Sequence, residues 1–399
     1  MGTGNIVQIV SLTNQMVMQK KALIAANYLG FIGFLWNDIN ILRSKDYAID
    51  FIGYDKDGSE EKKIGELLSD KEICFYNIPF DSKNPFSSVN IRAYKSISDL
   101  LQANRYELIH CHTPIVGLLV RLAASKYRFK GSIVVYTTHG LAFTHLSNFK
   151  TKALYKTLEW IMSFFTDAVI TINKEDYAAM MKMHAKNVFY INGVGVNCSK
   201  YCNVTIDRNL YRKQIGVASS DIMILSVGEL SNRKNHEAII RAIGLMHDKN
   251  KYVYVIAGKG MGVASTEDTL IQTAKQHDVR LILLGFRDDI PQLIHCSDIG
   301  AIPSIREGLG LAGIQSLCAG VPLVGSDVQG IKDYIVDGVT GYLCNPFDYI
   351  AFMRNIKKLS DASNRYNMNL HCHSMAMQFD IAVSKNQMRN IYDIILEKE

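Results

Sequence analysis

The chain has 399 residues, of which 48% are hydrophobic and only 7 are proline, a composition that excludes an intrinsically disordered or low-complexity protein. At about 150 residues per domain, this length predicts two to three domains. The net charge of +6 lies entirely in residues 1–200, which hold 23 Lys and Arg against 17 Asp and Glu.

The first apolar segment, residues 22–36 (ALIAANYLGFIGFLW), follows Lys20 and Lys21 and is apolar except for Asn27. Its 15 residues are fewer than the roughly 20 that span a bilayer, so the pattern predicts a buried or interfacial helix. It comes after a strand-like run, residues 5–12, and too far along the chain to be an ordinary signal peptide.

Residues 106–127 and 132–143 have the pattern of strand, helix and strand, and each strand ends in a histidine, His112 or His139. Ligands of open α/β sheets bind beyond the carboxyl ends of the strands, so both histidines are expected to face a cleft. The alternative is that each is only a hydrogen-bonding loop residue.

Two His-Cys-His triplets, residues 110–112 and 371–373, resemble metal-binding sequences. In a strand, alternation places Cys111 on the face opposite His110 and His112. In a helix, residues two apart do not share a face either. We therefore expect no metal at either triplet, because zinc sites usually need further ligands at set spacings.

Seven cations and no acid lie between Glu107 and Glu159. They are Arg121, Lys126, Arg128, Lys130, Lys150, Lys152 and Lys156. Such a patch suits anionic lipid headgroups or a pyrophosphate-linked substrate, and an ordinary solvated surface is the alternative. Nucleic acid is not expected, because no nucleic-acid-binding module accompanies the charge.

Glycine, polar and charged residues replace apolar strands at residues 193–212, where we place the connection between two domains. The second unit then starts with IMILSVG, and residues 226–243 predict a strand, a glycine turn and an amphipathic helix. Arg233 and Lys234 lie at that turn, where cations would neutralise a diphosphate. A solvated basic pair is the alternative. Gly258 and Gly260 follow another strand but lack the spacing of a dinucleotide fingerprint.

Residues 302–343 predict a strand end, a glycine turn, a helix, a second strand and another turn. Glu307 stands directly before Gly308-Leu309-Gly310, so its carboxylate leaves a loop that permits close backbone approach. The free N–H groups of the following helix suit an anion such as a diphosphate. The carboxylate suits sugar hydroxyls, from which it can accept hydrogen bonds.

These motifs, in this order, resemble the nucleotide-sugar site of the retaining glycosyltransferases of family 4, which have the two-domain GT-B fold. The segments HTP and YTTHG resemble signatures of bacterial transferases that build capsular, exopolysaccharide or O-antigen repeat units. The resemblance covers most of residues 70–345. It implies catalytic roles for Glu307, Lys234 and His139, and an acceptor side formed by His112 and His139. The donor side that it implies consists of Gly228, Arg233, Lys234, Gly258, Gly260, Phe286, Arg287, Gly308, Leu309, Gly310, Leu311 and Gln315.

Three segments depart from the family pattern. Gln315 stands where the family usually has a second Glu, and it cannot make the charge-assisted bond of a carboxylate to the ribose. Residues 139–143 read HGLAF where the subgroup commonly has HGFHF. Glu229 stands where many relatives have Arg, but a related bacterial polysaccharide subgroup also reads GEL there, so this departure carries little weight. Because of Gln315, the alternative interpretation is an impaired or non-catalytic protein that binds a nucleotide sugar. Another GT-B activity is also an alternative, such as that of a phosphorylase or an epimerase. We find neither the lysine context of a phosphorylase cofactor nor the histidine-carboxylate constellation of an epimerase.

We therefore predict an α/β protein of the GT-B type, with two Rossmann-like domains whose parallel sheets face a cleft. The expected parts are an acceptor-binding domain (1–200), a nucleotide-sugar-binding domain (201–379) and a final helix (380–399) that crosses back. The predicted activity is retaining transfer of a hexose or N-acetylhexosamine from a nucleoside diphosphate sugar, with UDP expected, to a lipid-linked saccharide. No cofactor or essential metal is expected. Eight cysteines without a CxxC pair fit reduced thiols, and with the basic patch they predict a cytoplasmic protein on the inner membrane face.

Overall fold

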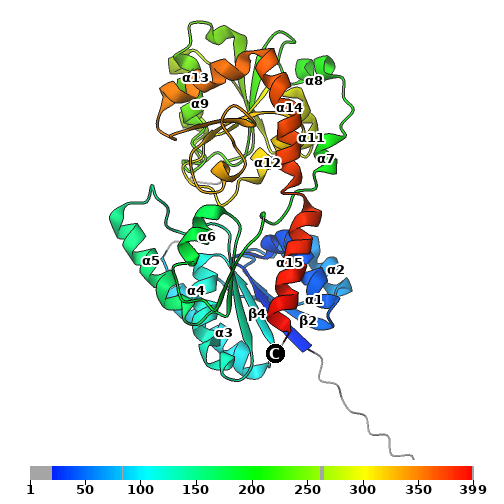
Figure 1. The fold of residues 1–399 in the computed structure, drawn as a ribbon, viewed down its shortest axis with the longest axis vertical. Coiled ribbons are helices and arrows are strands. Elements are labelled where there is room, and N and C mark those ends of the chain that lie inside the picture. Colours follow the sequence, from blue (N-terminus) through cyan, green and yellow to red (C-terminus); the bar gives the residue numbers. More distant parts are fainter. Residues whose placement is uncertain (1–19, 83, 261–264, 398–399) are drawn as a thin grey trace, which may run out of the picture.

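The computed structural model describes residues 20–82, 84–260 and 265–397. Its strands form two separate sheets, one in each of the two lobes that Figure 1 shows one above the other. Every pairing between neighbouring strands is parallel. Helices lie on the faces of both sheets, which confirms the predicted α/β class with two Rossmann-like sheets.

The first sheet has the order β3-β2-β1-β4-β5-β6-β7. Its strands are β1 (Lys20–Ala25), β2 (Tyr47–Gly53), β3 (Cys74–Asn77), β4 (Leu108–His112), β5 (Ile133–Thr138), β6 (Ala168–Thr171) and β7 (Asn187–Tyr190). The helices of this lobe are η1 (Leu29–Phe34), α1 (Trp36–Arg43), α2 (Ser59–Asp70), α3 (Ser88–Ala103), α4 (Pro114–Arg128), α5 (Phe149–Ser163) and α6 (Lys174–Met180). The strand order reverses between β1 and β4, the point at which such sheets open a crevice for ligands.

The second sheet has the order β10-β9-β8-β11-β12-β13. Its strands are β8 (Ile222–Val227), β9 (Tyr252–Ala257), β10 (Arg280–Gly285), β11 (Ile299–Ile302), β12 (Leu323–Ser326) and β13 (Gly341–Cys344). The helices are α9 (Glu237–Gly244), η2 (Lys249–Lys251), α10 (Glu267–His277), α11 (Ile290–Cys296), α12 (Leu311–Cys318), η4 (Ile331–Asp333), α13 (Tyr349–Ser360) and α14 (Ala362–Met377). Here the order reverses between β8 and β11, whose following loops carry Lys234 and Glu307.

The prediction of one helix over residues 22–36 is wrong. Residues 20–25 form β1, which pairs with β2 on one side and β4 on the other, and a 3₁₀ helix follows before α1 begins at Trp36. A central parallel strand is covered on both faces, so its sequence is continuously apolar and lacks the alternation of a half-exposed strand. The strand-like residues 5–12 lie outside the described residues.

The two lobes are joined twice. Residues 191–221 cross from β7 to β8 and contain two short helices, α7 (Ser199–Cys202) and α8 (Arg208–Gln214). Helix α15 (Ile381–Leu396), red in Figure 1, follows α14 and lies along the first lobe. There the Tyr392 hydroxyl and the His110 ring form a hydrogen bond. The Val196 N–H donates to the Phe379 carbonyl, and the Val196 carbonyl accepts from the Ile381 N–H. Helix α15 thus brings the end of the chain back to the first lobe.

Candidate active site at the domain interface

Glu307, in the loop after β11, is the hydrogen-bond acceptor in a compact cluster of charged side chains. Its Oε2 accepts hydrogen bonds from Lys234 Nζ at 2.8 Å, from Arg233 Nη1 at 3.1 Å and from Ser304 Oγ at 3.2 Å. Burial raises the pKa of this carboxyl, but the charges of Lys234 and Arg233 outweigh burial and hold its pKa below the usual value. The cluster therefore presents an ionised carboxylate with two cations beside it.

The loop that carries the two cations is fixed by its neighbours. The Asn235 amide donates to the carbonyls of Pro303 at 3.0 Å and Pro346 at 2.9 Å, with its own φ at 53°. The N–H of Ile305 donates to the Arg233 carbonyl at 2.9 Å. Buried His236 bridges the Tyr254 hydroxyl and the Glu229 carbonyl, at 3.0 and 3.1 Å. These contacts place the loops after β8 and β11 side by side.

Glu229, noted above as a departure, also belongs to this cluster. Its carboxylate accepts from Arg233 Nη2 and from Ser231 Oγ, both at 2.9 Å. Burial raises the pKa of Glu229, and the hydrogen bonds from Ser231 and Arg233 lower it to a net value below the usual one. Arg233 is thus bound by two carboxylates, whereas Lys234 has Glu307 alone among the described residues.

Gly308 lies where the two lobes come into close contact. A Cβ on Gly308 would lie 2.0 Å from the carbonyl oxygen of His139, and a Cβ on Gly140 would lie 3.0 Å from the Gly308 Cα. Asn173 of the first lobe donates its amide to the Gly308 carbonyl at 3.0 Å. Any side chain at Gly308 would therefore push the lobes apart, a second reason for glycine besides approach to a ligand.

The glycine turn leads directly into α12. Gly310 precedes the helix at a φ of 78°, a value that favours glycine, and Leu311 is the first helical residue. Among the described residues the N–H groups of Leu309, Gly310 and Leu311 have no acceptor. Leu309 itself is buried, and its side chain packs against Gly193, where a Cβ would lie 2.2 Å from its Cδ2. This arrangement suits an anion next to Lys234 and Arg233.

His112 and His139 lie together at the carboxyl ends of β4 and β5. Nδ1 of His112 and Nε2 of His139 are 3.1 Å apart, a hydrogen bond in which one ring donates and the other accepts. The ring of Phe31 meets His139 edge-on at 4.8 Å. Burial lowers the pKa of His139 to about 4 and that of His112 well below its usual value, so both rings are neutral near pH 7. The prediction that Cys111 faces away is confirmed, since its Sγ is hydrogen-bonded to the Val135 carbonyl, within a separate apolar cluster.

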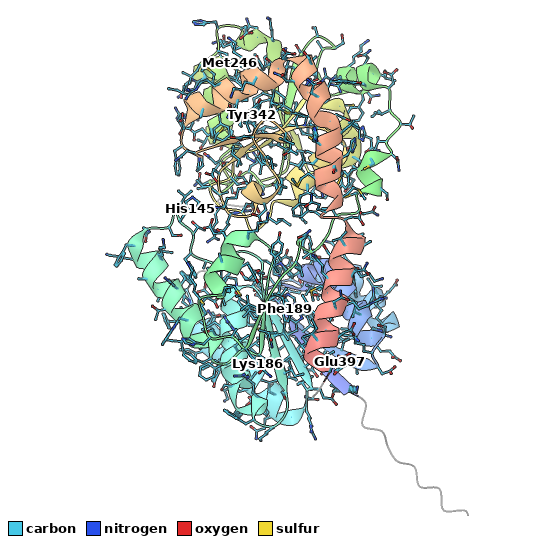
Figure 2. All side chains as sticks on the ribbon, viewed as in Figure 1. His145, Lys186, Phe189, Met246, Tyr342 and Glu397 are labelled. Atoms are coloured by element: carbon cyan, nitrogen blue, oxygen red, sulfur yellow. The ribbon has the colours of Figure 1, made fainter. Side chains whose placement is uncertain are left out.

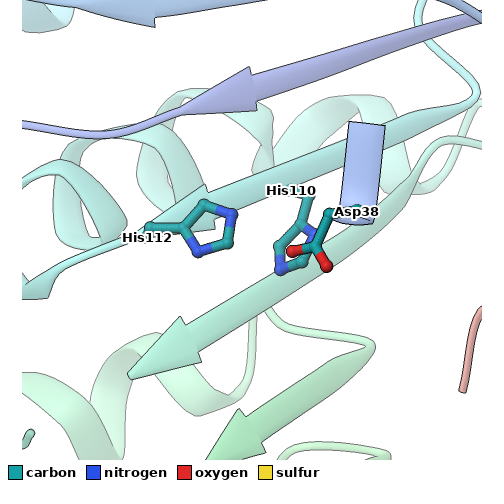
Figure 3. Close-up of side chains that lie close together, drawn as sticks. All are labelled: Asp38, His110 and His112. Atoms are coloured by element: carbon teal, nitrogen blue, oxygen red, sulfur yellow. The ribbon is translucent and has the colours of Figure 1, made fainter. Parts of the chain in front are cut away.

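Figure 3 shows Asp38 of α1 close to His110 and His112, with one ligand-type atom of each within 4.8 Å of the others. Both ring nitrogens of His110 already have partners, the Tyr392 hydroxyl at 2.8 Å and the Thr137 hydroxyl at 2.7 Å. A metal would have to displace one of them. The residues present therefore fit a hydrogen-bonded group better than a metal site.

The other predicted donor residues fall into two groups. Gly228 and Gly258 lie against each other and against Lys234, because a Cβ on Gly258 would be 1.7 Å from the Gly228 carbonyl and one on Gly228 would be 3.1 Å from the Lys234 Cε. A Cβ on Gly260 would meet Ser265, at 1.8 Å from its Oγ. Phe286 and Arg287 follow β10, an edge strand two places from β8, and Arg287 pairs with Asp289 at 2.8 Å. They are not joined to the Glu307 cluster.

Gln315 lies within α12, one turn after Leu311. Its side chain is half-buried and has no hydrogen-bond partner among the described residues. The position is thus on the helix whose N-terminus faces the cation cluster, with an amide free to take a ligand.

Comparison with known proteins identifies the family. The profile for glycosyl transferases group 1 matches residues 207–371, and the profile for glycosyl transferase 4-like proteins matches residues 26–173. The chain is 31% identical to the "Putative glycosyltransferase EpsD" of Bacillus subtilis (strain 168) over 337 residues, or 81% of this chain and 86% of that one. The chain belongs to glycosyltransferase family 4.

Two further similarities bear on this glycosyltransferase. It is 26% identical over 347 residues to the UDP-Gal:alpha-D-GlcNAc-diphosphoundecaprenol alpha-1,3-galactosyltransferase of Escherichia coli, covering 85% of this chain and 88% of that enzyme. Its fold is similar to that of Anabaena HepE in complex with UDP and glucose, with a TM-score of 0.74 at 19% identity over 94% of this chain and all of that one. The protein is a transferase enzyme with the GT-B fold.

No local pattern indicates the contacts that hold the two lobes of the glycosyltransferase together. The buried carboxylate of Asp176 accepts from the Gln329 amide at 2.9 Å across the interface, and from the Leu141 N–H at 2.9 Å. Lys332 pairs with Glu175 at 2.7 Å. Burial raises the pKa of Asp176 to about 7. Pairs of this kind join residues more than 150 positions apart and have no local pattern.

Proposed function

We propose that this glycosyltransferase moves a hexose or N-acetylhexosamine from a UDP-linked sugar to a lipid-linked saccharide, with retention at the anomeric carbon, in the synthesis of a bacterial surface polysaccharide. The observation that carries the proposal is the cluster of Glu307, Lys234 and Arg233 beside the open N-terminus of α12, opposite His139. The similarity to an enzyme named for UDP-Gal and a diphosphoundecaprenol saccharide supports the choice of donor and acceptor.

On the donor side, the chemistry is departure of a nucleoside diphosphate. Lys234, with Arg233 beside it, neutralises the charge that develops on the diphosphate, and the N–H groups of Leu309 to Leu311 share it. Lys234 must then redirect its ammonium from Glu307 toward the diphosphate. Glu307 accepts hydrogen bonds from the donor sugar, and Gln315 contacts the ribose. Cations and a helix dipole can supply this stabilisation, so we propose a reaction without an essential metal.

On the acceptor side, we propose that residues 1–200 bind the lipid-linked saccharide, while residues 201–379 bind the donor and the helix within 380–399 ties the two together. His139 and His112 lie where the acceptor would enter. Neutral imidazoles are suited to exchange hydrogen bonds with sugar hydroxyls, since each has one donor and one acceptor nitrogen.

A cavity of about 230 Å³ in the first lobe supports a lipid-linked acceptor. Its lining combines apolar side chains (Leu141, Phe143, Trp160), three lysines (Lys152, Lys156, Lys182) and two carboxyls (Glu175, Asp176). Glu175 is paired with Lys332, and burial raises the pKa of Asp176 to about 7, so the lysines outweigh the carboxyls. His145, labelled in Figure 2 at the level where the lobes meet, also lines it. Lysines beside apolar side chains suit a diphosphate attached to a lipid.

Helix α5 supports contact with the inner face of the plasma membrane. It exposes large apolar side chains beside its lysines, with Phe149 85% exposed and Trp160 47% exposed. Within the described part of the chain, no helix is both long enough and apolar enough to cross a bilayer. We propose peripheral attachment, in which apolar side chains enter the interface and lysines attract anionic headgroups.

The second candidate function is binding of a nucleotide sugar without catalysis of its transfer, by a protein of the same fold. Gln315 favours it, because an amide in place of a carboxylate loses the charge-assisted bond to the ribose.

A donor screen separates the two candidates. Purified protein is incubated with UDP-, GDP- and dTDP-sugars and a lipid-diphosphate saccharide, and the released nucleoside diphosphate is quantified. Transfer activity predicts release from one donor that is reduced at least about tenfold by Glu307→Gln but unchanged by Glu237→Gln, which removes a carboxylate from the half-buried pair with Arg241. Donor binding without release from any donor would support the second candidate instead.

A further inference from the structure

A buried carboxyl that the proposed reaction does not use lies behind the histidine pair. Asp38 of α1 is 8% exposed, and its oxygen lies within 4.8 Å of a ring nitrogen of both His110 and His112. Figure 3 shows the three side chains together, with Asp38 coming from α1 and both histidines from β4. No hydrogen bond from the Asp38 side chain to another described residue is formed.

Only one ring nitrogen of these two histidines lacks a partner. His110 is hydrogen-bonded through both nitrogens, to Tyr392 and Thr137. His112 uses Nδ1 for His139, which leaves Nε2, a buried atom without a partner. A buried polar atom without a hydrogen bond is unfavourable, so a partner for this nitrogen is expected.

A small cavity is lined by both Asp38 and His112. It measures about 10 Å³, enough for one water molecule, and Asp38, His112 and His139 are among the residues that line it. One water that makes two hydrogen bonds of about 2.8 Å joins polar atoms about 4.5 Å apart, which matches the spacing of up to 4.8 Å found here.

We propose that Asp38 is a positioning residue that determines, through one water molecule and His112, which ring nitrogen of His139 carries the proton. When Asp38 is ionised, it accepts from the water, and the water accepts from Nε2–H of His112. Nδ1 of His112 then accepts from Nε2–H of His139, whose Nδ1 is left as an acceptor. When Asp38 is protonated, it donates, every bond in the chain reverses, and Nδ1 of His139 becomes a donor.

The reversal needs only one proton, gained or lost at Asp38. Burial lowers the pKa of His110 to about 3 and of His139 to about 4, and it lowers that of His112 well below its usual value, so all three rings stay neutral between pH 5 and 8. Burial raises the pKa of Asp38 to about 7. The hydrogen-bond direction at His139 is thus set to change close to neutral pH.

Other charged or titratable groups surround this chain of bonds. Burial raises the pKa of Tyr392, on α15, far above neutral pH, so its hydroxyl keeps its proton. Asp176 of α6 reaches the loop after His139 through the Leu141 N–H, with its own pKa raised to about 7. From the second lobe, the approaching groups are Arg306, on the Ala142 carbonyl, and ionised Glu307. Of the two buried carboxyls with a pKa of about 7, Asp38 is the one that lies within 4.8 Å of the His110 and His112 rings, so Asp38→Asn separates its effect from that of Asp176.

NMR of the unliganded protein tests the inference without any substrate. Long-range ¹H–¹⁵N correlations of ¹⁵N-histidine protein report the protonated ring nitrogen, and the His139 signal is assigned by its loss in His139→Asn. A chelator in the sample prevents a metal at Asp38 from setting the tautomer. The proposal predicts Nε2–H on His139 at pH 8 and Nδ1–H at pH 6. Asp38→Asn should abolish the dependence on pH, whereas Asp99→Asn, at an exposed carboxyl of α3, should leave it intact. The same tautomer at both pH values in the wild type, or a switch that survives Asp38→Asn, would overturn it.

The kinetic consequence rests on the proposed function. If ionised Asp38 supports transfer, wild-type kcat/KM should fall about tenfold from pH 8 to pH 6, because a group with a pKa of about 7 changes from mostly ionised to mostly protonated. The Asp38→Asn profile should be flat over that range, and a tenfold fall in the variant would overturn the link to the reaction. A tautomer switch in a protein that releases no nucleotide would leave the inference standing and remove the proposed function.

Discussion

Replacing Glu307 with Gln removes one charge and leaves the size of the side chain nearly unchanged. The carboxylate holds Lys234 at 2.8 Å and Arg233 at 3.1 Å. Charge-assisted hydrogen bonds contribute about 1.5–3 kcal/mol and neutral ones about 0.5–1.5 kcal/mol, so each contact weakens by about 1 kcal/mol. Arg233 is 37% exposed and keeps its second carboxylate, Glu229, which limits the total loss of stability to about 1–2 kcal/mol.

The same substitution should separate turnover from nucleotide binding. Turnover should fall at least about tenfold, or roughly 1.4 kcal/mol of transition-state stabilisation, because the donor sugar loses its charged acceptor. Affinity for the nucleoside diphosphate should stay equal or rise, since Lys234 and Arg233 are released and a negative charge near the phosphates is gone. Turnover is measured as nucleotide release, and affinity by calorimetry. A variant that loses affinity and turnover in equal measure would refute this role and make Glu307 a residue that only builds the loop.

Three further substitutions test other parts of the molecule. Gln315→Glu should tighten binding of the nucleoside diphosphate by about 1 kcal/mol in a calorimetric titration, because a carboxylate bonds the ribose hydroxyls more strongly; equal or weaker binding would place Gln315 away from the ribose. Lys152→Ala together with Lys156→Ala should reduce sedimentation with anionic vesicles, and salt should release the wild type, since exposed charges are screened within about 8 Å at physiological ionic strength. Equal binding to neutral vesicles would exclude the electrostatic part. The lowered pKa of His139 adds stability that is complete above pH 6.5 and is lost as the pH falls toward 4, so His139→Asn should lose about 2 kcal/mol less unfolding free energy than the wild type between pH 7 and 5 in urea titrations. If the unfolding free energies of the variant and the wild type change equally between pH 7 and 5, the His139 ring is not buried as a neutral group.

Local patterns predicted the second lobe well. The cations of the loop after β8 and the carboxylate after β11 were each marked by a strand that ends in a glycine turn, and the structure brings them within hydrogen-bond distance. The order of the strands makes this possible, because β8 and β11 are neighbours although some 70 residues separate their loops. Two neighbours that fix this site, Asn235 and His236, were missed, since neither belongs to a hydrophobic period or a charge pattern.

The first lobe was harder to predict from sequence. A fully buried central strand looks like a short apolar helix, and the error over residues 22–36 also hid the start of α1 and therefore Asp38. The partner of His110 is Tyr392, 282 positions away on the returning helix. Gly308 was predicted from approach to a ligand, yet its space is also taken by the His139 carbonyl of the other lobe. Such contacts depend on how the two lobes pack against each other, which cannot be predicted from any one segment of the sequence.

The glycosidic bond that the enzyme makes is the most direct test of sugar transfer with retention. The preferred donor from the screen and a lipid-diphosphate saccharide are incubated with the protein, and the anomeric configuration of the new linkage is read from the one-bond and three-bond NMR couplings of the purified product. Retention predicts the anomeric configuration of the donor in the product, with no product from the Glu307→Gln protein above about a tenth of the wild-type amount. An inverted linkage would contradict retention, and nucleotide release without any glycosylated lipid would contradict a lipid-linked acceptor.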